Sequence, residues 1–330
     1  MEPGQSVARV SAEHRGAWEV WTATGTRRAT LAGSLRHQGA SAAVGDWVVI
    51  EATDDGEARI AALLPRRSAL ARRAAGRTSR AQVVAANLDT VFVVTAPDGD
   101  VSPRRVERYV TAIFDGGAVP VVLLNKADLG DASETALATL VAAAPGVEVL
   151  AVSAKTGHGL DALAPWLGPG ATVALVGSSG VGKSTLVGAL TGLTLRTAEL
   201  GVDDRGMHTT TARQMFRLPS GAVLVDTPGM RELGLLDAAE GLGAAFADLE
   251  ALVVACRFRD CTHESEPGCA VLDAVAQGTL PAERLASYRK LERELAHHGE
   301  RLEGWEKAEQ RKQHRAFARS VKRETRRRTR

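Results

Sequence analysis

The chain has 330 residues, of which 45% are hydrophobic and 24% are charged, and its formal net charge is +2. A chain of this length and composition can bury two or more hydrophobic cores, and none of its apolar runs approaches the length of a membrane span. The N-terminus lacks the apolar region of a secretory signal peptide, so we expect a cytoplasmic protein without a membrane partner.

Short apolar segments separated by glycine-containing turns predict a small β-barrel in residues 1–75. The segments are 18–21, 28–31, 47–50 and 58–60, and the turns contain Gly25, Gly33, Gly45 and Gly56. A five-stranded OB-like barrel that binds RNA fits this length. The tryptophans of these segments fit the barrel core and a base-stacking surface equally well. The sequence therefore does not indicate which face of the barrel binds RNA.

Two basic runs stand out against the nearly neutral net charge. The first lies in a stretch without acidic residues, and the second is the tail 315–330, with three consecutive arginines near its end. Basic runs usually form a solvated surface, but two of them in one chain favour binding to nucleic acid. The arginines of the first run are Arg59, Arg66, Arg67, Arg72, Arg73, Arg77 and Arg80.

The strand-like segment 119–124 is followed by Asn125-Lys126-Ala127-Asp128. A carboxylate such as that of Asp128 accepts hydrogen bonds from N1-H and the 2-amino group of guanine, which adenine cannot offer. Asn125 can hold neighbouring loops and read the other edge of the ring, and the aliphatic stem of Lys126 can cover the ring face. The tetrad therefore predicts a guanine site.

A second base-contacting motif follows the apolar stretch 147–152. It consists of Ser153, Ala154 and Lys155. Either motif alone fits a helix cap or a loop that arose by chance. Their joint occurrence on successive strand ends favours guanine specificity.

The segment 177–185 matches the phosphate-binding loop G-x-x-x-x-G-K-[ST], with an apolar strand before it and a helical pattern after it. Glycines let the backbone curl so that several N-H groups and a helix N-terminus face the phosphates. Lys183 adds a positive charge at the outer phosphates, and the Ser184 hydroxyl suits magnesium. The predicted phosphate-binding residues are Gly177, Ser178, Ser179, Gly180, Val181, Gly182, Lys183, Ser184 and Thr185.

A further nucleotide motif, Asp226-Thr227-Pro228-Gly229, follows the strand-like segment 222–225. It places Asp226 near magnesium and the Gly229 amide near the terminal phosphate. Between the two phosphate motifs lie Thr209, Thr210 and Thr211. We expect one of these threonines, preferably Thr210, to close on magnesium together with Ser184 and Asp226, although such runs also occur in ordinary exposed loops and strands.

Met230 stands at the position where Ras-like enzymes carry the glutamine that orients the attacking water, and a thioether cannot do this. Either a partner completes the site, or another side chain orients the water. His208, beside the threonines, is the local candidate, and with Lys183 and Thr210 it forms the predicted catalytic set. His208 can equally cap the switch loop or contact a partner.

All three cysteines of the chain lie close together in the sequence and have one histidine among them. The four residues are Cys256, Cys261, His263 and Cys269. Three cysteines and one histidine form a complete tetrahedral set for one structural zinc ion per chain. Because all four ligand positions are filled by protein, we do not expect a substrate water on this metal. The alternative is that they are unrelated thiols and a surface histidine.

The last apolar pattern lies beyond this cluster. Leu285, Tyr288, Leu291 and Leu295 repeat at helical spacing in a charged background. They predict a helix that packs its apolar stripe on the nucleotide domain and continues into the loosely ordered basic tail.

The order of the motifs is unusual, because the guanine motifs precede the phosphate loop. In most GTPases the phosphate loop comes first, so this order predicts a circularly permuted GTPase. We expect a multidomain α/β protein with an OB-like barrel at 1–75, a permuted P-loop GTPase domain with a mainly parallel sheet at 76–240, and a zinc-binding module with a helix and basic tail at 241–330.

These features together resemble the ribosome small-subunit-dependent GTPase family, a group of bacterial late assembly factors. The resemblance covers nearly the whole chain, including the segment 82–89 before the first GTPase strand and 258–261 in the knuckle. The His208-Thr209-Thr210 segment resembles the switch of the family. However, Gly206-Met207 precede it where many members carry Gly-Arg or Gly-Gln.

The resemblance implies GTP hydrolysis that is stimulated by the small ribosomal subunit, binding near its decoding region, and release after hydrolysis. It also implies zinc, a cytoplasmic location, and contact with ribosomal RNA; magnesium would accompany GTP or GDP, and a monomer is the default expectation.

Two alternatives stay open. The protein can be a permuted GTPase of the large subunit or another RNA particle, or an RNA-binding scaffold with a GTP site but without useful turnover. Lys183, Ser184 and Asp226 argue against the scaffold, whereas Met230 keeps it open. Stimulation by small subunits, large subunits and free RNA distinguishes the three.

Overall fold

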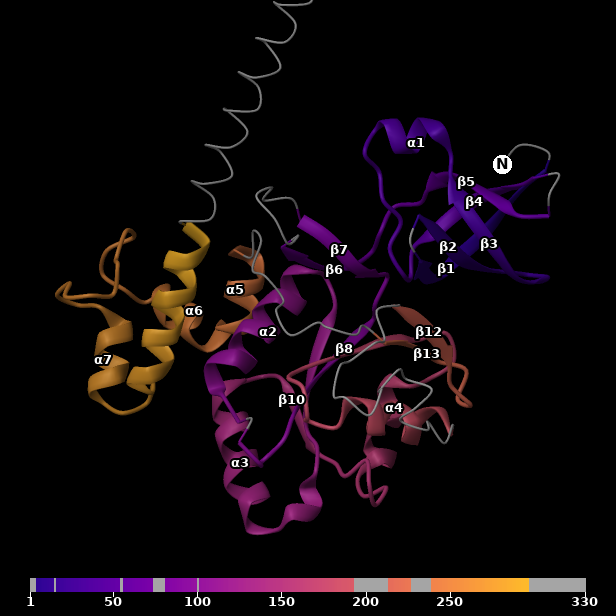
Figure 1. The fold of residues 1–330 in the computed structure, drawn as a ribbon. Helices are drawn as coiled ribbons and strands as arrows, with labels where there is room; N and C mark the ends of the chain where they lie inside the picture. The colour runs from indigo at the N-terminus through magenta and orange to yellow at the C-terminus, as the bar shows by residue number, and fades with distance from the viewer. Residues whose placement is uncertain are drawn as a thin grey trace, which may run out of the picture.

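The computed structural model describes residues 4–14, 16–53, 56–73, 81–99, 101–192, 213–226 and 239–296. Figure 1 shows an N-terminal barrel and a C-terminal group of helices on opposite sides of a central domain built on a sheet. Within these ranges, no helix combines the length and the apolar character needed to cross a membrane.

Five strands form the barrel in the order β1-β2-β3-β5-β4, and β4 pairs back onto β1 to close it. The four predicted strand segments lie within β2, β3, β4 and β5, whereas β1 was not predicted. This ten-residue strand contains small and polar residues, which carry a weak strand signal until their cross-strand partners are known. The short helix α1 (Gly33–His37) connects β3 to β4. The strands are β1 (Gln5–His14), β2 (Ala17–Thr22), β3 (Gly25–Leu31), β4 (Trp47–Ala52) and β5 (Ala58–Leu63).

The central sheet has the order β10-β9-β8-β11-β13-β12, and β12 is its one antiparallel strand. All residues of β8 and of β11 are buried, as expected for parallel strands covered on both faces. The predicted mainly parallel sheet is therefore confirmed. Its strands are β8 (Thr90–Thr95), β9 (Val119–Leu124), β10 (Glu148–Ala151), β11 (Thr172–Val176), β12 (Gln214–Arg217) and β13 (Val223–Asp226).

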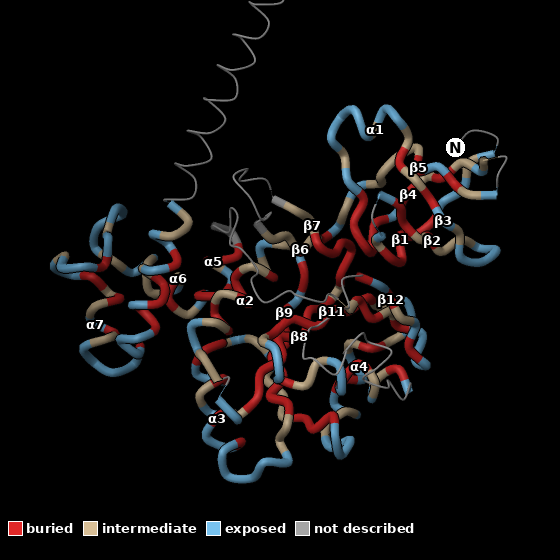
Figure 2. The backbone as a smooth tube through the Cα atoms, viewed as in Figure 1, coloured by how far each residue is buried: buried red, intermediate tan, exposed pale blue. Residues whose placement is uncertain are grey.

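The two faces of this sheet contribute to separate hydrophobic cores. Along β8, Val91 and Val93 belong to the core that includes α2 and α3, whereas Phe92 and Val94 belong to the core that includes α4. This alternation follows from the two-residue period of a strand. In Figure 2 the inner strands β8, β9 and β11 of the central sheet are mostly buried, whereas much of α3 is exposed. The helices are α2 (Pro103–Asp115), α3 (Asp131–Ala143) and α4 (Lys183–Thr191), with 3-10 turns η1 (Ala127–Leu129) and η2 (Leu160–Trp166).

A hairpin of β6 (Ala69–Arg73) and β7 (Ala81–Ala86) connects the barrel to the central sheet. Segment 82–86 therefore lies in this hairpin, and Asn87, in a left-handed conformation, separates it from β8. A single backbone pair, Ala12 with Gln214, joins β1 to β12, so the barrel continues the central sheet at its edge.

The C-terminal helices are α5 (Ala239–Ala245), α6 (Ala247–Val253), α7 (Ala270–Ala276) and a helix whose described part is 282–296. The helix predicted from Leu285, Tyr288 and Leu291 is confirmed, since all three are buried in the same core as α2 and α3.

One arginine ties these helices to the central domain. The side chain of Arg284, 3% exposed, donates to both carboxylate oxygens of Asp248 (2.8 and 2.7 Å) and to Glu107 of α2 (3.3 Å). It also donates to the carbonyls of Ala143 and Ala245. Burial raises the pKa of Glu107, although the neighbouring Arg284 opposes this shift.

Gly45 lies where the barrel meets the hairpin. Its φ of +93° is in the left-handed region, and its carbonyl accepts hydrogen bonds from Arg9 Nε (3.3 Å) and Asn87 Nδ2 (3.0 Å). A Cβ atom at this position would overlap the carbonyl oxygen of Ala86. The junction therefore needs glycine for its conformation and for the close approach of two backbones.

We expect Gly45→Ala to destabilise the protein more than Gly56→Ala. Gly56 has a similar φ of +82° but no atom near its Cβ position. Gly56→Ala should cost about 1 kcal/mol of conformational strain, and Gly45→Ala should cost roughly 1–3 kcal/mol more through overlap. Urea unfolding followed by circular dichroism measures both free energies, and equal losses would contradict the close approach.

Candidate functional site

The motifs found in the sequence meet at one edge of the central sheet. Asn125 follows β9, Ser153 lies just beyond β10, and the phosphate loop follows β11, while Asp226 is the last residue of β13. These four strands are parallel, so their carboxyl ends lie at the same edge. Open α/β sheets bind ligands at this edge.

The phosphate loop owes its shape to three glycines with positive φ: Gly177, Gly180 and Gly182. A side chain at Gly177 would overlap the carbonyl of Val94 in β8, and one at Gly182 would overlap the Asn125 amide. Gly180 has open space around its Cβ position and is exposed. Two glycines thus allow the loop to pack against the sheet, and the third keeps its outer side open.

The loop ends where α4 begins, at Lys183. The Lys183 ammonium donates to the carbonyls of Gly177 (2.8 Å) and Ser178 (2.5 Å), so the side chain lies back over the loop. Ser184 and Thr185, in the first turn of α4, are exposed, as is Ser179 in the loop. The unpaired N-H groups at a helix N-terminus favour phosphate.

The amide of Asn125 joins three motifs that are far apart in the sequence. Its Nδ2 donates to the carbonyl of Val181 in the phosphate loop (2.8 Å), and its Oδ1 accepts from the Ala154 N-H (3.0 Å). The residue is 2% exposed. The predicted role of Asn125 in holding neighbouring loops agrees with these contacts.

Asp128 and Ser153 form the second link between the two guanine motifs. Ser153 Oγ donates to Asp128 Oδ1 (2.6 Å) and accepts from the Thr156 N-H (3.2 Å). The hydrogen bond from Ser153 lowers the pKa of Asp128, and the charges of Lys155 and Lys126 act in the same direction. Asp128 is therefore an anion, able to accept hydrogen bonds, throughout the physiological pH range.

Two residues near these motifs were not identified from the sequence. Asp98 accepts from the Lys126 ammonium (2.6 Å), and this hydrogen bond lowers the pKa of Asp98. Arg105 of α2 donates to the hydroxyl of Ser178 in the phosphate loop (2.7 Å). Neither residue lies within a recognisable motif, because each contact depends on how α2 and its preceding loop pack on the sheet.

Asp226 lies next to the phosphate loop across the sheet. Strands β13 and β11 pair in parallel, with Val225 opposite Ala174. Asp226 is the next residue after Val225, so it lies close to the end of β11, where the phosphate loop begins. Asp226 and Ser184 offer a carboxylate and a hydroxyl, which are oxygen donors that suit magnesium. The predicted switch residues His208, Thr209, Thr210 and Thr211, together with Gly229 and Met230, lie outside the described residues.

A separate cluster gathers Cys256, Cys261, His263 and Cys269, whose ligand atoms all lie within 4.8 Å of one another. His263 Nδ1 lies 3.6 Å from Cys256 Sγ and 3.4 Å from Cys269 Sγ, and these two sulfurs are 3.9 Å apart. Zinc bonds of about 2.3 Å to sulfur and about 2.0 Å to nitrogen imply tetrahedral edges of roughly 3.8 Å and 3.5 Å. The cluster is thus compatible with zinc in both donor type and spacing.

Local structure holds the cluster in this arrangement. Cys269, 2% exposed, precedes α7, and its Sγ accepts a hydrogen bond from the Leu272 N-H (3.4 Å). His263 has a positive φ of 58°, uncommon for a residue with a side chain. Gly268 also has a positive φ, and its carbonyl accepts from the Arg257 N-H (3.1 Å).

Comparisons with known proteins agree with this geometry. A model of the RsgA GTPase family matches residues 63–236. The Small ribosomal subunit biogenesis GTPase RsgA of Methanosarcina acetivorans is 45% identical over 317 residues, or 95% of this chain and 86% of the relative. A second such protein, RsgA 2 of Lactiplantibacillus plantarum, is 46% identical over 304 residues, or 90% of this chain and 86% of the relative.

Two solved structures share the fold. YjeQ from Thermotoga maritima is 26% identical with a TM-score of 0.66, and the alignment covers 88% of this chain and 99% of that one. YloQ, described as a circularly permuted GTPase, is 24% identical with a TM-score of 0.64 over 88% of this chain and 95% of that one. The predicted permuted fold is therefore confirmed. Because the family model spans more than half of the chain and the relatives cover most of it, the chain belongs to the RsgA GTPase family.

Proposed function

We propose that this protein binds and hydrolyses GTP during a late stage in the biogenesis of the small ribosomal subunit. The observation that carries the nucleotide chemistry is the Asn125 amide, which bonds the phosphate loop and the second guanine motif at once. The ribosomal role is supported by the relatives, which are named for biogenesis of the small ribosomal subunit.

Guanine would lie between the two motifs that Asn125 and Ser153 connect. The Asp128 carboxylate would accept from N1-H and the 2-amino group, and Ser153 keeps it charged and oriented. Lys126, held by Asp98, would extend its aliphatic stem over the ring. Adenine lacks the donors that Asp128 needs, so ATP leaves this carboxylate without a partner.

The phosphates would occupy the loop 177–182 and the N-terminus of α4. Lys183 would turn from the loop carbonyls to the outer phosphates, and Thr185 and the loop N-H groups would complete the cradle. Ser184, Asp226 and Thr210 would hold magnesium, which when bound neutralises charge that develops on the transferred phosphate.

Hydrolysis needs a group that orients water, and Met230 cannot supply it. We assign this role to His208, which docking on the ribosomal subunit would bring into place. GTP and magnesium would order the segments around Thr209 and Asp226 for a tight grip on ribosomal RNA, and hydrolysis would weaken that grip and release the factor.

We propose one structural zinc ion at Cys256, Cys261, His263 and Cys269. The four ligands fill the tetrahedron and leave no position for substrate. Its task would be to stabilise the loop between α6 and α7. We also propose a monomer that acts in the cytoplasm, with 1–75, 76–240 and 241–330 as its barrel, GTPase and zinc-binding units.

We expect isolated small ribosomal subunits, but not large ones, to stimulate GTP hydrolysis, and ATP to be left intact. His208→Ala should reduce the stimulated rate by about 100-fold, because general acid-base or water-orienting groups contribute this much. The Kd for GTP should stay unchanged, since His208 is assigned to water rather than to the nucleotide. Phosphate release and nucleotide binding measure the two effects.

His37→Ala is the matched control for that measurement, because His37 is an exposed histidine on α1 of the barrel. Stimulation by large subunits alone would overturn the ribosomal assignment. A His208→Ala protein that retains full stimulated turnover would remove His208 from the mechanism.

Asp128→Asn should lower the affinity for GTP by at least about 100-fold through the loss of charge-assisted hydrogen bonds. It should raise the affinity for XTP, because xanthine has a carbonyl that the new amide can donate to. Asp131→Asn removes an exposed carboxylate nearby in α3 and serves as the control. Competition binding with GTP, XTP and ATP measures the change in nucleotide preference. If the variant still prefers GTP as strongly as the unaltered protein does, Asp128 does not contact the base.

Cys261→Ser should reduce bound zinc from about one ion per chain to near zero and lower the thermal stability of the C-terminal module, because metal binding contributes directly to folding. Ser265→Ala changes a residue between two of the ligands without removing one and should keep the metal. Metal content by mass spectrometry and thermal unfolding test this, and full zinc in Cys261→Ser would refute the ligand set.

A further inference from the structure

The outer face of the barrel carries a tryptophan, an arginine and a second tryptophan on three adjacent strands. Arg9 of β1 lies directly opposite Trp21 of β2 on one side and Trp47 of β4 on the other. Directly opposed residues of paired strands have their side chains on the same face. Each of these three residues has a neighbour in the chain that belongs to the barrel core, namely Ala8, Val20 and Val48. Because side chains alternate between the two faces of a strand, Arg9, Trp21 and Trp47 lie on the outer face.

This placement separates the tryptophans of the barrel into two kinds. Trp18 is 7% exposed and its Nε1 donates to the Ala42 carbonyl (3.0 Å), so it belongs to the core. Trp47 is 40% exposed although it is a large apolar residue. Trp21 is half-buried and lies on the outer face.

Arg9 is held in place by neutral acceptors from three segments. Its side chain donates to the carbonyls of Gly45 (3.3 Å) and Asn87 (3.2 Å) and to the hydroxyl of Thr172 (2.9 Å). Its guanidinium carbon lies 5.2 Å from the centroid of the Trp47 ring. Burial lowers the pKa of Arg9, and the charge of Asp89 opposes this, but an arginine stays protonated in proteins. A fixed positive charge therefore sits beside an exposed indole.

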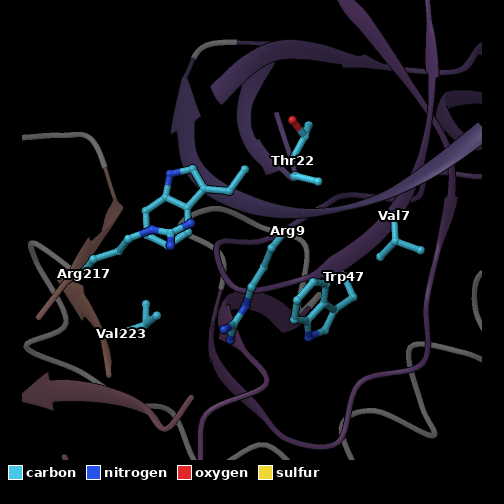
Figure 3. A pocket seen from close by; sticks show the side chains of 8 residues that line it. Val7, Arg9, Thr22, Trp47, Arg217 and Val223 are labelled. Atoms are coloured by element: carbon cyan, nitrogen blue, oxygen red, sulfur yellow. The ribbon is translucent and has the colours of Figure 1, made fainter. Parts of the chain in front are cut away.

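The central sheet supplies the opposite wall. Arg217 of β12 is exposed, and its guanidinium carbon lies 4.5 Å from the centroid of the Trp21 ring. With Val223 of β13 it encloses a cleft of about 290 Å³. Figure 3 shows Arg9 between Trp47 and Arg217 in this cleft. The eight residues that line it include no acidic residue: Val7, Arg9, Trp21, Thr22, Ala23, Trp47, Arg217 and Val223.

Two arginines and two indoles without a carboxylate match the chemistry of a nucleotide. Aromatic side chains and arginines form stacking surfaces for unpaired bases, and arginine also pairs with phosphate. The arginine–indole contacts also help to hold the barrel on the sheet. That structural task does not require Trp47 to be exposed or Arg217 to face the solvent.

We propose that this cleft, formed by Trp21, Arg9, Trp47 and Arg217, binds an unpaired nucleotide of single-stranded RNA. The base stacks on the exposed face of Trp47, and Arg217 contacts a backbone phosphate. A base in such a site is recognised by its π-face, so the cleft accepts all four bases with modest preference. The inference rests on the proposed function in that the RNA would be ribosomal.

The cleft and the predicted magnesium ligand Asp226 lie on the same strand pair. Arg217 and Val223 are opposite each other on β12 and β13, and the same strand pair ends with Gln214 opposite Asp226. Val223, which lines the cleft, therefore lies on the strand whose last residue is the proposed magnesium ligand.

A fluorescein-labelled single-stranded oligoadenylate, titrated by anisotropy, tests the cleft directly. Trp47→Ala and Arg217→Gln should each weaken binding about tenfold, and Trp47→Phe should restore most of the affinity. Arg217→Gln should also reduce the slope of log affinity against log salt by about one. Arg28→Gln is the matched control, since Arg28 is an exposed arginine on β3 that pairs with Glu57 (3.7 Å).

Thermal unfolding of each variant checks that the barrel remains folded, and binding to isolated small subunits is measured in parallel. If Trp47→Ala and Arg217→Gln bind the oligonucleotide as tightly as the unaltered protein does, the proposal is wrong. Loss of subunit binding in that case would identify the cleft as a docking site for a ribosomal protein instead. If small subunits fail to stimulate the unaltered protein, the proposed function fails, while the oligonucleotide titration still decides the role of the cleft.

Discussion

The buried amide of Asn125 is the contact on which the nucleotide site depends. It bonds the phosphate loop through Val181 and the second guanine motif through Ala154, and its position leaves no room for a side chain at Gly182. One side chain thus connects the segments 125–128 and 153–155 with the phosphate loop. A buried amide with both of its groups paired is rigid, because each lost hydrogen bond would leave a buried polar group unsatisfied.

The arrangement of the strands explains why the order of the motifs along the chain can be permuted without loss of the site. Asn125, Ser153, the phosphate loop and Asp226 each follow or end a parallel strand, so their relative positions are set by strand order in the sheet. The chain connections between the strands run elsewhere. Permutation changes where the chain ends lie, and in this protein the barrel precedes the predicted guanine motifs while the Cys-His cluster follows Asp226.

Buried arginines join the added parts to the central domain. Arg9 connects the barrel to Asn87 and Thr172, and Arg284 connects the C-terminal helices to α2 through Glu107. Both donate to backbone carbonyls or side chains of several segments at once. Arginine suits this task because its planar group offers five donors in a fixed geometry. The barrel and the C-terminal helices are therefore held against the sheet by directed polar contacts as well as by apolar packing.

The amino-acid sequence alone was enough to predict the guanine motifs, the phosphate loop and the Cys-His cluster, because each depends on a few residue types at fixed short spacing. The order of these motifs also predicted the permuted fold. Apolar residues at regular spacing predicted strands of the central sheet and the helix that contains Leu285, Tyr288 and Leu291. Tertiary structure decided what no local pattern encodes: the strand β1, the partners Asp98 and Arg105, and the division of the tryptophans between the core and the outer face. Those features depend on which strands become neighbours, and neighbours such as Arg9 and Trp47 are far apart in the chain.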